Sequence, residues 1–329
     1  MLSGFVLTTR YSAAFRNRQS HTWRRYAVAR CARIAPVYFA VLAVTVVAYL
    51  LTADAVSLAG SSATRSEWMV SLALNAVPLQ AWVPDDLIQQ YWNAPSWSIG
   101  VELLFYLLMP WAWSRCRLPT SWAFMAGIVA AHALIQFGGR ALFAPVLDEK
   151  LVEGYAARMP LMSSMYFLIG MVLAERRRVL SPQQRCANAW LPLAALVVSA
   201  SLSSTWSGNA IADIAVQQIV WFMLFAWLIE ALANERPASG WTAWPRTLLG
   251  TRPVVLLGKA SYSLYLIHWL PLGFALNLLP PTVRGGAAAW LFVALVVLAS
   301  VAVYRLLEEP ARRAINATAG TRRGSSGCR

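Results

Sequence analysis

The sequence predicts an all-α fold, a polytopic transmembrane helical bundle with eight complete spans and the N-terminal stub of a further one. Two observations predict it. Mostly apolar stretches recur along the chain, each near the roughly 20 residues that a helix needs to cross a 30 Å hydrocarbon core. Basic residues fall almost entirely in every second gap between these stretches. The expected spans are 36–53, 94–113, 120–138, 158–175, 190–206, 213–233, 260–279 and 287–307.

The distribution of Lys and Arg predicts the orientation, because basic residues near span ends are retained on the cytoplasmic side. Of the 28 basic residues, 23 lie before the first span, in alternate gaps after it, or between Arg305 and the C-terminus. The segment 10–35 and the C-terminus are therefore expected in the cytoplasm. The net charge of +14 is then mostly an orientation signal, and we expect no nucleic-acid partner.

Three regions depart from regular spans. Met1 to Thr9 is apolar from its first residue and too short to cross, so it resembles the stub of a longer helix. Glu67 to Val83 is apolar enough to enter the membrane, but a crossing there would reverse the charge alternation downstream. We expect it to lie in the interface or to re-enter from the same face. The chain divides into a membrane domain, 1–313, and a tail, 314–329, expected to be disordered and cytoplasmic.

The cysteines indicate neither disulfides nor a metal. Cys31, Cys116, Cys186 and Cys328 all fall in gaps assigned to the cytoplasm, where thiols stay reduced. Their spacings match no zinc pattern, so we predict no metal site.

Glu102 is a carboxyl expected deep inside the span 94–113, with polar residues on the same helical face. At 1.5 Å per residue from Ala94, it lies about 12 Å along its helix from the outer face. Ser98 and Tyr106 lie one turn away on the same face, which predicts a polar pocket facing the bundle interior. A charge at that depth is costly unless it is paired or hydrated. We therefore favour a functional role over a protonated carboxyl that only bonds a neighbouring helix.

Two histidines are also expected inside the spans. His268 lies at a depth similar to that of Glu102, on a helix entering from the cytoplasm, and catalytic and packing roles both stay open. His132 is alone on its helix among alanines, and we favour a packing role for it.

Arg30 and Arg33 are three residues apart at the cytoplasmic mouth of the first full span, so they share a helical face. Two guanidinium groups so placed can hold a phosphorylated ligand bidentately. They can equally anchor the helix to anionic lipid headgroups, and the residues alone leave both roles open.

Four segments carry a family resemblance. In order they read LSGFVL, RCARIAP, PSWSIGVELLFY, and SYSLYLIHWLP paired with EEPARR; they occupy Leu2–Leu7, Arg30–Pro36, Pro95–Tyr106, and Ser261–Pro271 with Glu308–Arg313. Together they resemble the acyltransferase 3 family of integral membrane acyltransferases, which includes bacterial O-antigen and exopolysaccharide O-acetylases. Any one segment is a weak signal, but four in this order on this topology are specific.

The resemblance implies transfer of an acyl group, most often acetyl, from cytoplasmic acyl-CoA to a hydroxyl of a sugar or lipid-linked glycan. Acyl-CoA, expected as acetyl-CoA, is then a co-substrate, with no cofactor bound; the carbohydrate acceptor and the lipid bilayer are the other partners. The expected location is a bacterial cytoplasmic (inner) membrane. By analogy, Arg30 and Arg33 would hold the CoA end, while Glu102 with Ser98 and Tyr106 would line the transfer pocket.

The resemblance also implies a catalytic histidine that this sequence does not contain. Family members typically have a basic residue in the first span, followed eleven positions later by the histidine taken as the base. This chain begins inside what would be the second span, so we expect it to be weakly active or inactive as written. Either Met1 is an internal methionine taken for the start, which we favour, or the gene is truncated. His268 substitutes as the base only if its ring comes within about 3 Å of the acceptor hydroxyl, or one bridging water away.

Two functions of other classes stay open. A transporter or flippase for a glycan or lipid intermediate would also place polar groups in the membrane. The absence of obvious inverted halves and of paired Gly/Pro-broken spans argues against it. A catalytically silent relative that scaffolds a partner is the third alternative.

The topology is testable with single cysteines in a background without the native ones. We expect Arg24→Cys and Arg117→Cys to react with a membrane-impermeant maleimide from the cytoplasmic side only, because both positions lie in basic gaps. Arg65→Cys, in an outer gap, is the control that reacts in intact cells. Labelling of positions 24 and 117 from opposite sides contradicts the predicted topology.

Overall fold

A computed structural model of the chain describes residues 1–17, 22–52, 64–83, 85–143, 160–185, 188–203, 210–234, 243–278, 280 and 285–321. Over these ranges the regular secondary structure is helical, and no strand occurs in them. The all-α prediction is confirmed for this part of the chain.

The helices group into two compact units whose residues interleave along the chain, where the sequence analysis expects one bundle. The first unit comprises Met1–Gln19 with Leu107–Thr251, and the second comprises Ser20–Tyr106 with Arg252–Arg329. The boundary between Tyr106 and Leu107 falls inside α5, Trp97–Arg115.

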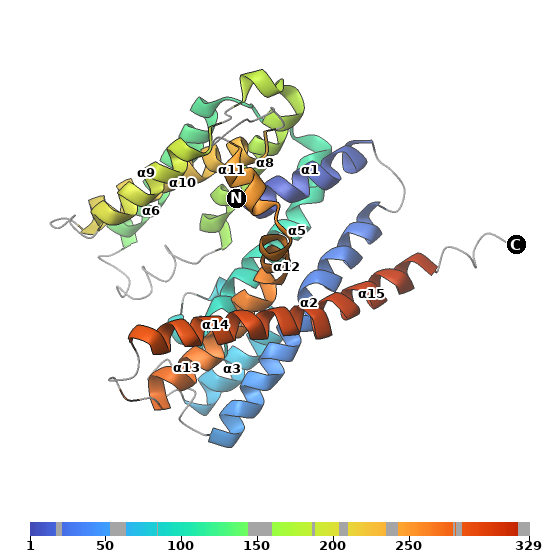
Figure 1. Cartoon of the computed structure of the whole chain (residues 1–329), viewed down its shortest axis with the longest axis vertical. Helices are drawn as coiled ribbons and strands as arrows, with labels where there is room; N and C mark the ends of the chain where they lie inside the picture. Colours follow the sequence, from blue (N-terminus) through green and yellow to red (C-terminus); the bar gives the residue numbers. More distant parts are fainter. Residues whose placement is uncertain are drawn as a thin grey trace, which may run out of the picture. The chain divides into compact units, whose positions relative to one another are not determined.

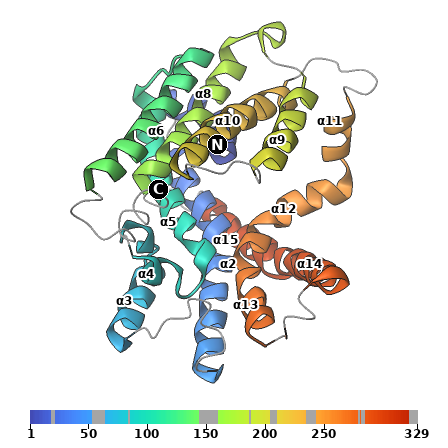
Figure 2. The same ribbon diagram turned by 90° about the vertical axis from the view of Figure 1, so that its left-hand side faces the viewer.

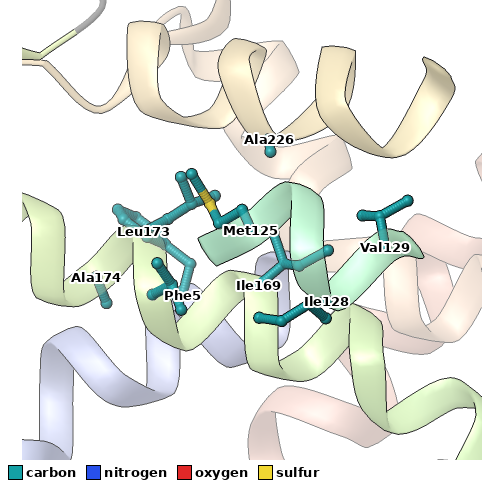
Figure 3. Close-up of a cluster of buried hydrophobic side chains, with 9 residues drawn as sticks. Phe5, Met125, Ile128, Val129, Ile169, Leu173, Ala174 and Ala226 are labelled. Atoms are coloured by element: carbon teal, nitrogen blue, oxygen red, sulfur yellow. The ribbon is translucent and has the colours of Figure 1, made fainter. Parts of the chain in front are cut away.

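Four helices of the first unit surround one apolar core. Figure 3 shows Phe5 from α1 near Ile169, Leu173 and Ala174 of α8, with Met125, Ile128 and Val129 of α6 and Ala226 of α10. In Figure 2, α6, α8 and α10 lie side by side, and each contacts the other two. The bounds of the helices in this unit are α1 Leu2–Arg16, α6 Trp122–Phe143, α8 Pro160–Val179, α9 Trp190–Ser203, α10 Ala210–Leu232 and α11 Trp244–Leu249.

Two glycines allow α1 and α8 to approach closely. A Cβ atom at Gly4 would overlap the backbone carbonyl of Phe167, and one at Gly170 would overlap the backbone of Met1 and Phe5. Backbone atoms cannot move aside as a flexible side chain can, so only glycine fits at these two positions.

The second unit is built around α2, Thr22–Thr52, and the C-terminal helices. In Figures 1 and 2, α12 lies beside α14, and α15 lies beside α2; both pairs are in contact. A smaller apolar core contains Val37, Tyr38, Ile99 and Leu266. The other bounds in this unit are α3 Arg65–Ala76, η1 Gln80–Trp82, α4 Asp86–Gln90, η2 Ala94–Ser96, α12 Arg252–Ile267, α13 Trp269–Leu278, α14 Gly286–Val303, the π-helical turn η6 Tyr304–Glu308, and α15 Glu309–Thr321.

Two helical stretches among the described residues are long and apolar enough to cross a membrane, Thr22–Leu51 and Gly286–Thr318. Their most apolar windows are only 17% and 11% buried within the protein. Helices that expose so much apolar surface are expected to face lipid. The structure is therefore consistent with a membrane helical protein, and the count of eight spans stays a prediction.

The expected span 260–279 is not one continuous helix. It is divided at His268, because α12 ends at Ile267 and α13 begins at Trp269. Pro271 explains the break, since it has no N–H to donate to the carbonyl of Ile267 and its ring crowds that carbonyl.

The helix of the expected span 287–307 does not end at residue 307. It passes through the π-helical turn η6 into α15, which reaches Thr321. Residues 314–321 of the tail expected to be disordered are therefore helical, and 322–329 lie outside the described residues.

The outer segment that was expected at the interface forms α3, and the chain then turns back through η1. A capping box begins α3: the carboxylate of Glu67 accepts hydrogen bonds from the hydroxyl and the backbone N–H of Thr64, both at 2.7 Å. These bonds lower the pKa of Glu67. Gln80 is fully buried, and its amide donates to the carbonyl of Ser96 at 2.9 Å, which ties η1 to the start of α5.

We expect Gly170→Ala to destabilise the protein by roughly 1–3 kcal/mol, because the added methyl group overpacks the contact between α1 and α8. Gly127→Ala in α6 is the matched control, since a Cβ there meets nothing within 4 Å. Removal of a helical glycine should leave stability unchanged or raise it by about 0.5–1 kcal/mol. Thermal unfolding of the purified protein in detergent measures both, and equal midpoints for the two variants contradict this packing.

Candidate active site

All six site residues expected from the sequence lie in the second unit. Three helices supply them: Arg30 and Arg33 come from α2, Ser98, Glu102 and Tyr106 from α5, and His268 from the break after α12.

Glu102 and Tyr106 form a hydrogen-bonded pair. The Tyr106 hydroxyl donates to Oε2 of Glu102 at 3.0 Å, and Tyr106 is only 8% exposed. The two residues are one turn apart on α5, as the i, i+4 spacing predicts. Glu102 is also close enough to Tyr262 and Tyr265 of α12 for its charge to act on both hydroxyls. The carboxyl is therefore hydrogen-bonded within α5 and within electrostatic range of α12.

Ser98 is hydrogen-bonded to a tyrosine of α12. The Tyr265 hydroxyl lies 2.9 Å from Oγ of Ser98 and 2.8 Å from the carbonyl oxygen of Pro95. The Ser98 hydroxyl donates to that same carbonyl at 3.1 Å. One residue further along α12, the carbonyl of Leu266 accepts a hydrogen bond of 3.0 Å from the buried amide of Asn93. These contacts hold the end of α12 against the start of α5.

His268 occupies the break between α12 and α13. Its Nδ1 atom lies 3.2 Å from the carbonyl oxygen of Leu264, and its ring is half-buried next to Tyr265, 6.2 Å away between centroids. When Nδ1–H donates to Leu264, the proton is on Nδ1 and Nε2 keeps its lone pair. In that tautomer Nε2 is the nitrogen that can accept a proton.

Arg30 extends from α2 to α5. Its guanidinium carbon lies 5.7 Å from the ring centroid of Tyr106, within cation–π distance. The same tyrosine ring packs edge-on against Tyr26, one turn before Arg30, at 6.3 Å. Arg30 is half-buried, so its guanidinium lies against Tyr106 while part of the side chain stays exposed.

Arg33 has an internal anionic partner. Its Nη1 atom lies 3.0 Å from Oε1 of Glu308, which is fully buried, and its guanidinium carbon lies 5.6 Å from the ring centroid of Tyr262. Ser263 donates to the other carboxylate oxygen of Glu308 at 2.7 Å, and Tyr262 donates to the carbonyl of Ile34 at 2.9 Å. Arg30 and Arg33 share a helical face, as expected, but their surroundings differ.

Comparison with known proteins identifies the family. Residues 1–306 match the acyltransferase 3 family, whose description is "Acyltransferase domain". The chain belongs to this family. It is also similar to the acyltransferase MdmB of Streptomyces mycarofaciens, with 28% identity over 335 residues that cover 95% of this chain and 79% of the relative. No solved structure matches the chain.

The family membership confirms the resemblance found in the sequence. The protein is an acyltransferase of a membrane-associated family, and it transfers groups other than amino-acyl groups. The comparisons give no support to the transporter or scaffold alternatives.

Sequence reasoning did not single out four residues that bond to or pack beside the candidate site: Tyr262, Ser263, Tyr265 and Glu308. Tyr262 and Tyr265 lie three residues apart, a spacing that places both on the face of α12 toward α2 and α5. That spacing was a usable signal. The pairing of Glu308 with Arg33 had none, because 275 residues separate the two in sequence.

The cysteines and His132 are the other residues of this kind that the sequence singled out. No group of three or more His, Cys, Asp or Glu side chains in the described ranges is arranged to hold a metal ion. Cys31 and Cys116 are free thiols, and Cys186 and Cys328 lie outside the described residues. In the first unit, buried His132 packs against the rings of Tyr166 and Phe222, as its predicted packing role requires.

We expect Glu308→Ala to destabilise the acyltransferase by roughly 2–4 kcal/mol, because the substitution leaves Arg33 without its buried partner. Glu309→Ala is the neighbouring control. It removes ion pairs with Arg312 and the largely exposed Arg313, which should cost about 0–1 kcal/mol. Thermal unfolding in detergent compares the two variants, and an equal loss of stability contradicts a structural role for the buried pair.

Proposed function

We propose that this acyltransferase moves an acyl group, most simply acetyl, from acyl-CoA to a hydroxyl of a sugar or glycan acceptor. The observation that carries the proposal is a set of polar groups in the second unit, in which Tyr106 is bonded to Glu102 and Tyr265 is bonded to Ser98. We call it the polar strip; its members are Arg30, Tyr106, Glu102, Ser98, Tyr265 and His268. Within membrane-spanning helices, ionisable and polar groups are expensive, and their presence is a default indication of a functional site.

The donor enters at the end of the polar strip that carries arginine. By the distribution of basic residues, Arg30 lies on the cytoplasmic side, where acyl-CoA is available. A guanidinium group suits the phosphates of CoA because it offers paired N–H donors. Arg33 supports this end indirectly, since it holds α2 against Glu308 and keeps part of its side chain, 29%, exposed.

The chemistry requires a base and hydrogen-bond donors. The acceptor oxygen attacks the thioester carbonyl, a new C–O bond forms as the C–S bond breaks, and CoA leaves as the thiolate. The hydroxyl proton must pass to a base, and the developing oxyanion must be met by donors already in place. The polar strip supplies both kinds of group.

His268 is the member of the polar strip suited to accept the proton. Its Nδ1 atom is turned toward Leu264, so Nε2 retains a lone pair for the acceptor hydroxyl. The imidazole lies at the break between α12 and α13 and is half-buried, so part of the ring stays accessible.

The role of Glu102 is to orient and polarise the hydroxyls of Tyr106 and Tyr265. Its carboxylate accepts the hydrogen bond of Tyr106 and lies within electrostatic reach of Tyr265, whose hydroxyl can turn from Pro95 toward a developing oxyanion. We assign to Glu102, Ser98 and Tyr106 the walls of the transfer pocket.

Glu102→Gln and His268→Gln should each lower the rate of acyl transfer by about 10²–10⁴-fold. The first removes the carboxylate that orients the tyrosine hydroxyls, and the second removes the base that accepts the proton. The assay follows labelled acetyl from acetyl-CoA into a sugar acceptor in membranes that hold the protein. Glu67→Gln is the matched control, since this glutamate is exposed on α3.

Binding of acyl-CoA provides a second readout that does not depend on the rate of transfer. Arg30→Gln should weaken binding of acetyl-CoA about tenfold, whereas Glu102→Gln should leave it unchanged. Full transfer by Glu102→Gln would restore the purely structural role for this carboxyl. Absence of acetyl-CoA binding by the unchanged protein would contradict the proposed donor.

A further inference from the structure

A second polar feature of the second unit lies outside the polar strip. A pocket of about 430 Å³ opens where α12, η6 and α15 meet. Its lining consists of Lys259, Tyr304, Arg305, Glu309, Pro310 and Arg313. None of these residues belongs to the polar strip, so the pocket calls for its own explanation.

The lining carries more positive than negative charge. Three of its residues are cations and one, Glu309, is an anion. The carboxylate of Glu309 is already paired with Arg313 at 2.7 Å and with Arg312 outside the lining, and it also accepts a hydrogen bond from Tyr304. Lys259 and Arg305 are exposed and have no acidic partner among the described residues. Two uncompensated cations therefore face one pocket from different helices.

The backbone of this region explains how the cations are brought together. Tyr304 and Glu308 are the buried residues of the π-helical turn η6, which leaves Arg305 exposed. Tyr304 is 6% exposed and supplies a rigid wall, and its hydroxyl fixes Glu309 at 3.2 Å. π-helical turns are rare and occur frequently at functional sites. The turn orients Arg305 toward the same pocket that Lys259 lines from α12.

We propose that this pocket binds a phosphate group of a ligand. Lys259 and Arg305 would form ion pairs with the phosphate, and Arg313 would lie at the rim. A volume of about 430 Å³ is in the range of small-molecule sites and exceeds what a bare ion needs. The distribution of basic residues assigns the pocket to the cytoplasmic side. Two sources of the phosphate are available there: the nucleotide end of an acyl-CoA molecule and the headgroup of an anionic phospholipid.

The test compares the full-length protein with a double variant that carries Lys259→Gln and Arg305→Gln. Both proteins are studied in two binding experiments. In the first arm, adenosine 3′,5′-bisphosphate is titrated into the protein in phosphatidylcholine nanodiscs. In the second, phosphatidylglycerol retained by the detergent-purified protein is counted by native mass spectrometry. Arg252→Gln is the matched control, because it removes an exposed cation from the same helix without touching the pocket.

We expect the double variant to weaken one of the two interactions about tenfold or more, while Arg252→Gln leaves both unchanged. Weaker bisphosphate binding identifies the nucleotide end, and loss of retained phosphatidylglycerol identifies the headgroup. Unchanged binding in both arms overturns the proposal. An equal loss in Arg252→Gln also overturns it, because only net charge would then matter.

Unfolding midpoints of all variants show whether a loss of binding comes from misfolding. Lys259 and Arg305 are exposed, so we expect these midpoints to match that of the unchanged protein. No acyl transfer is measured, so failure of this proposal leaves the proposed function intact.

Discussion

The buried ion pair between Arg33 and Glu308 is the constraint on which the second unit depends. A carboxylate with no exposed surface loses its hydration, and it is tolerated only when partners replace the lost water. Glu308 receives hydrogen bonds from Arg33 of α2 and Ser263 of α12. Next to these residues, Tyr262 donates to the carbonyl of Ile34, again from α12 to α2. Three helices distant in sequence are thereby fixed to one another.

The polar strip follows from this arrangement. Once α12 is fixed against α2, Tyr265 meets Ser98, and Asn93 bonds to the end of α12 at Leu266. The same pair also separates the roles of the two arginines. Arg33 is held by its ion pair with Glu308. Arg30, one turn earlier, lies over the ring of Tyr106 at the end of the polar strip. Two arginines on one helical face thus have different surroundings.

The first unit uses close packing as well as charge. Glycines let α1 and α8 approach until their backbones touch, and Arg16 of α1 pairs with Glu175 of α8 at 2.6 Å. Arg176 was counted in the sequence only as an orientation signal. In the structure it is 5% exposed, pairs with Glu230 at 2.6 Å, and lies over the ring of Trp122. A basic residue beside a span can therefore be a structural partner within the fold.

The sequence by itself determined the local features of this acyltransferase: apolar helices, the shared face of Glu102 and Tyr106, and the family motifs. Each depends on residues within a turn or two of one another, and helical periodicity makes such relations readable. Tertiary structure alone decided that Glu308 pairs with Arg33 and that Tyr265 meets Ser98. Those contacts join residues separated by more than 160 positions. No periodic pattern links such residues, because their meeting depends on how whole helices pack and on which buried charges must find a partner.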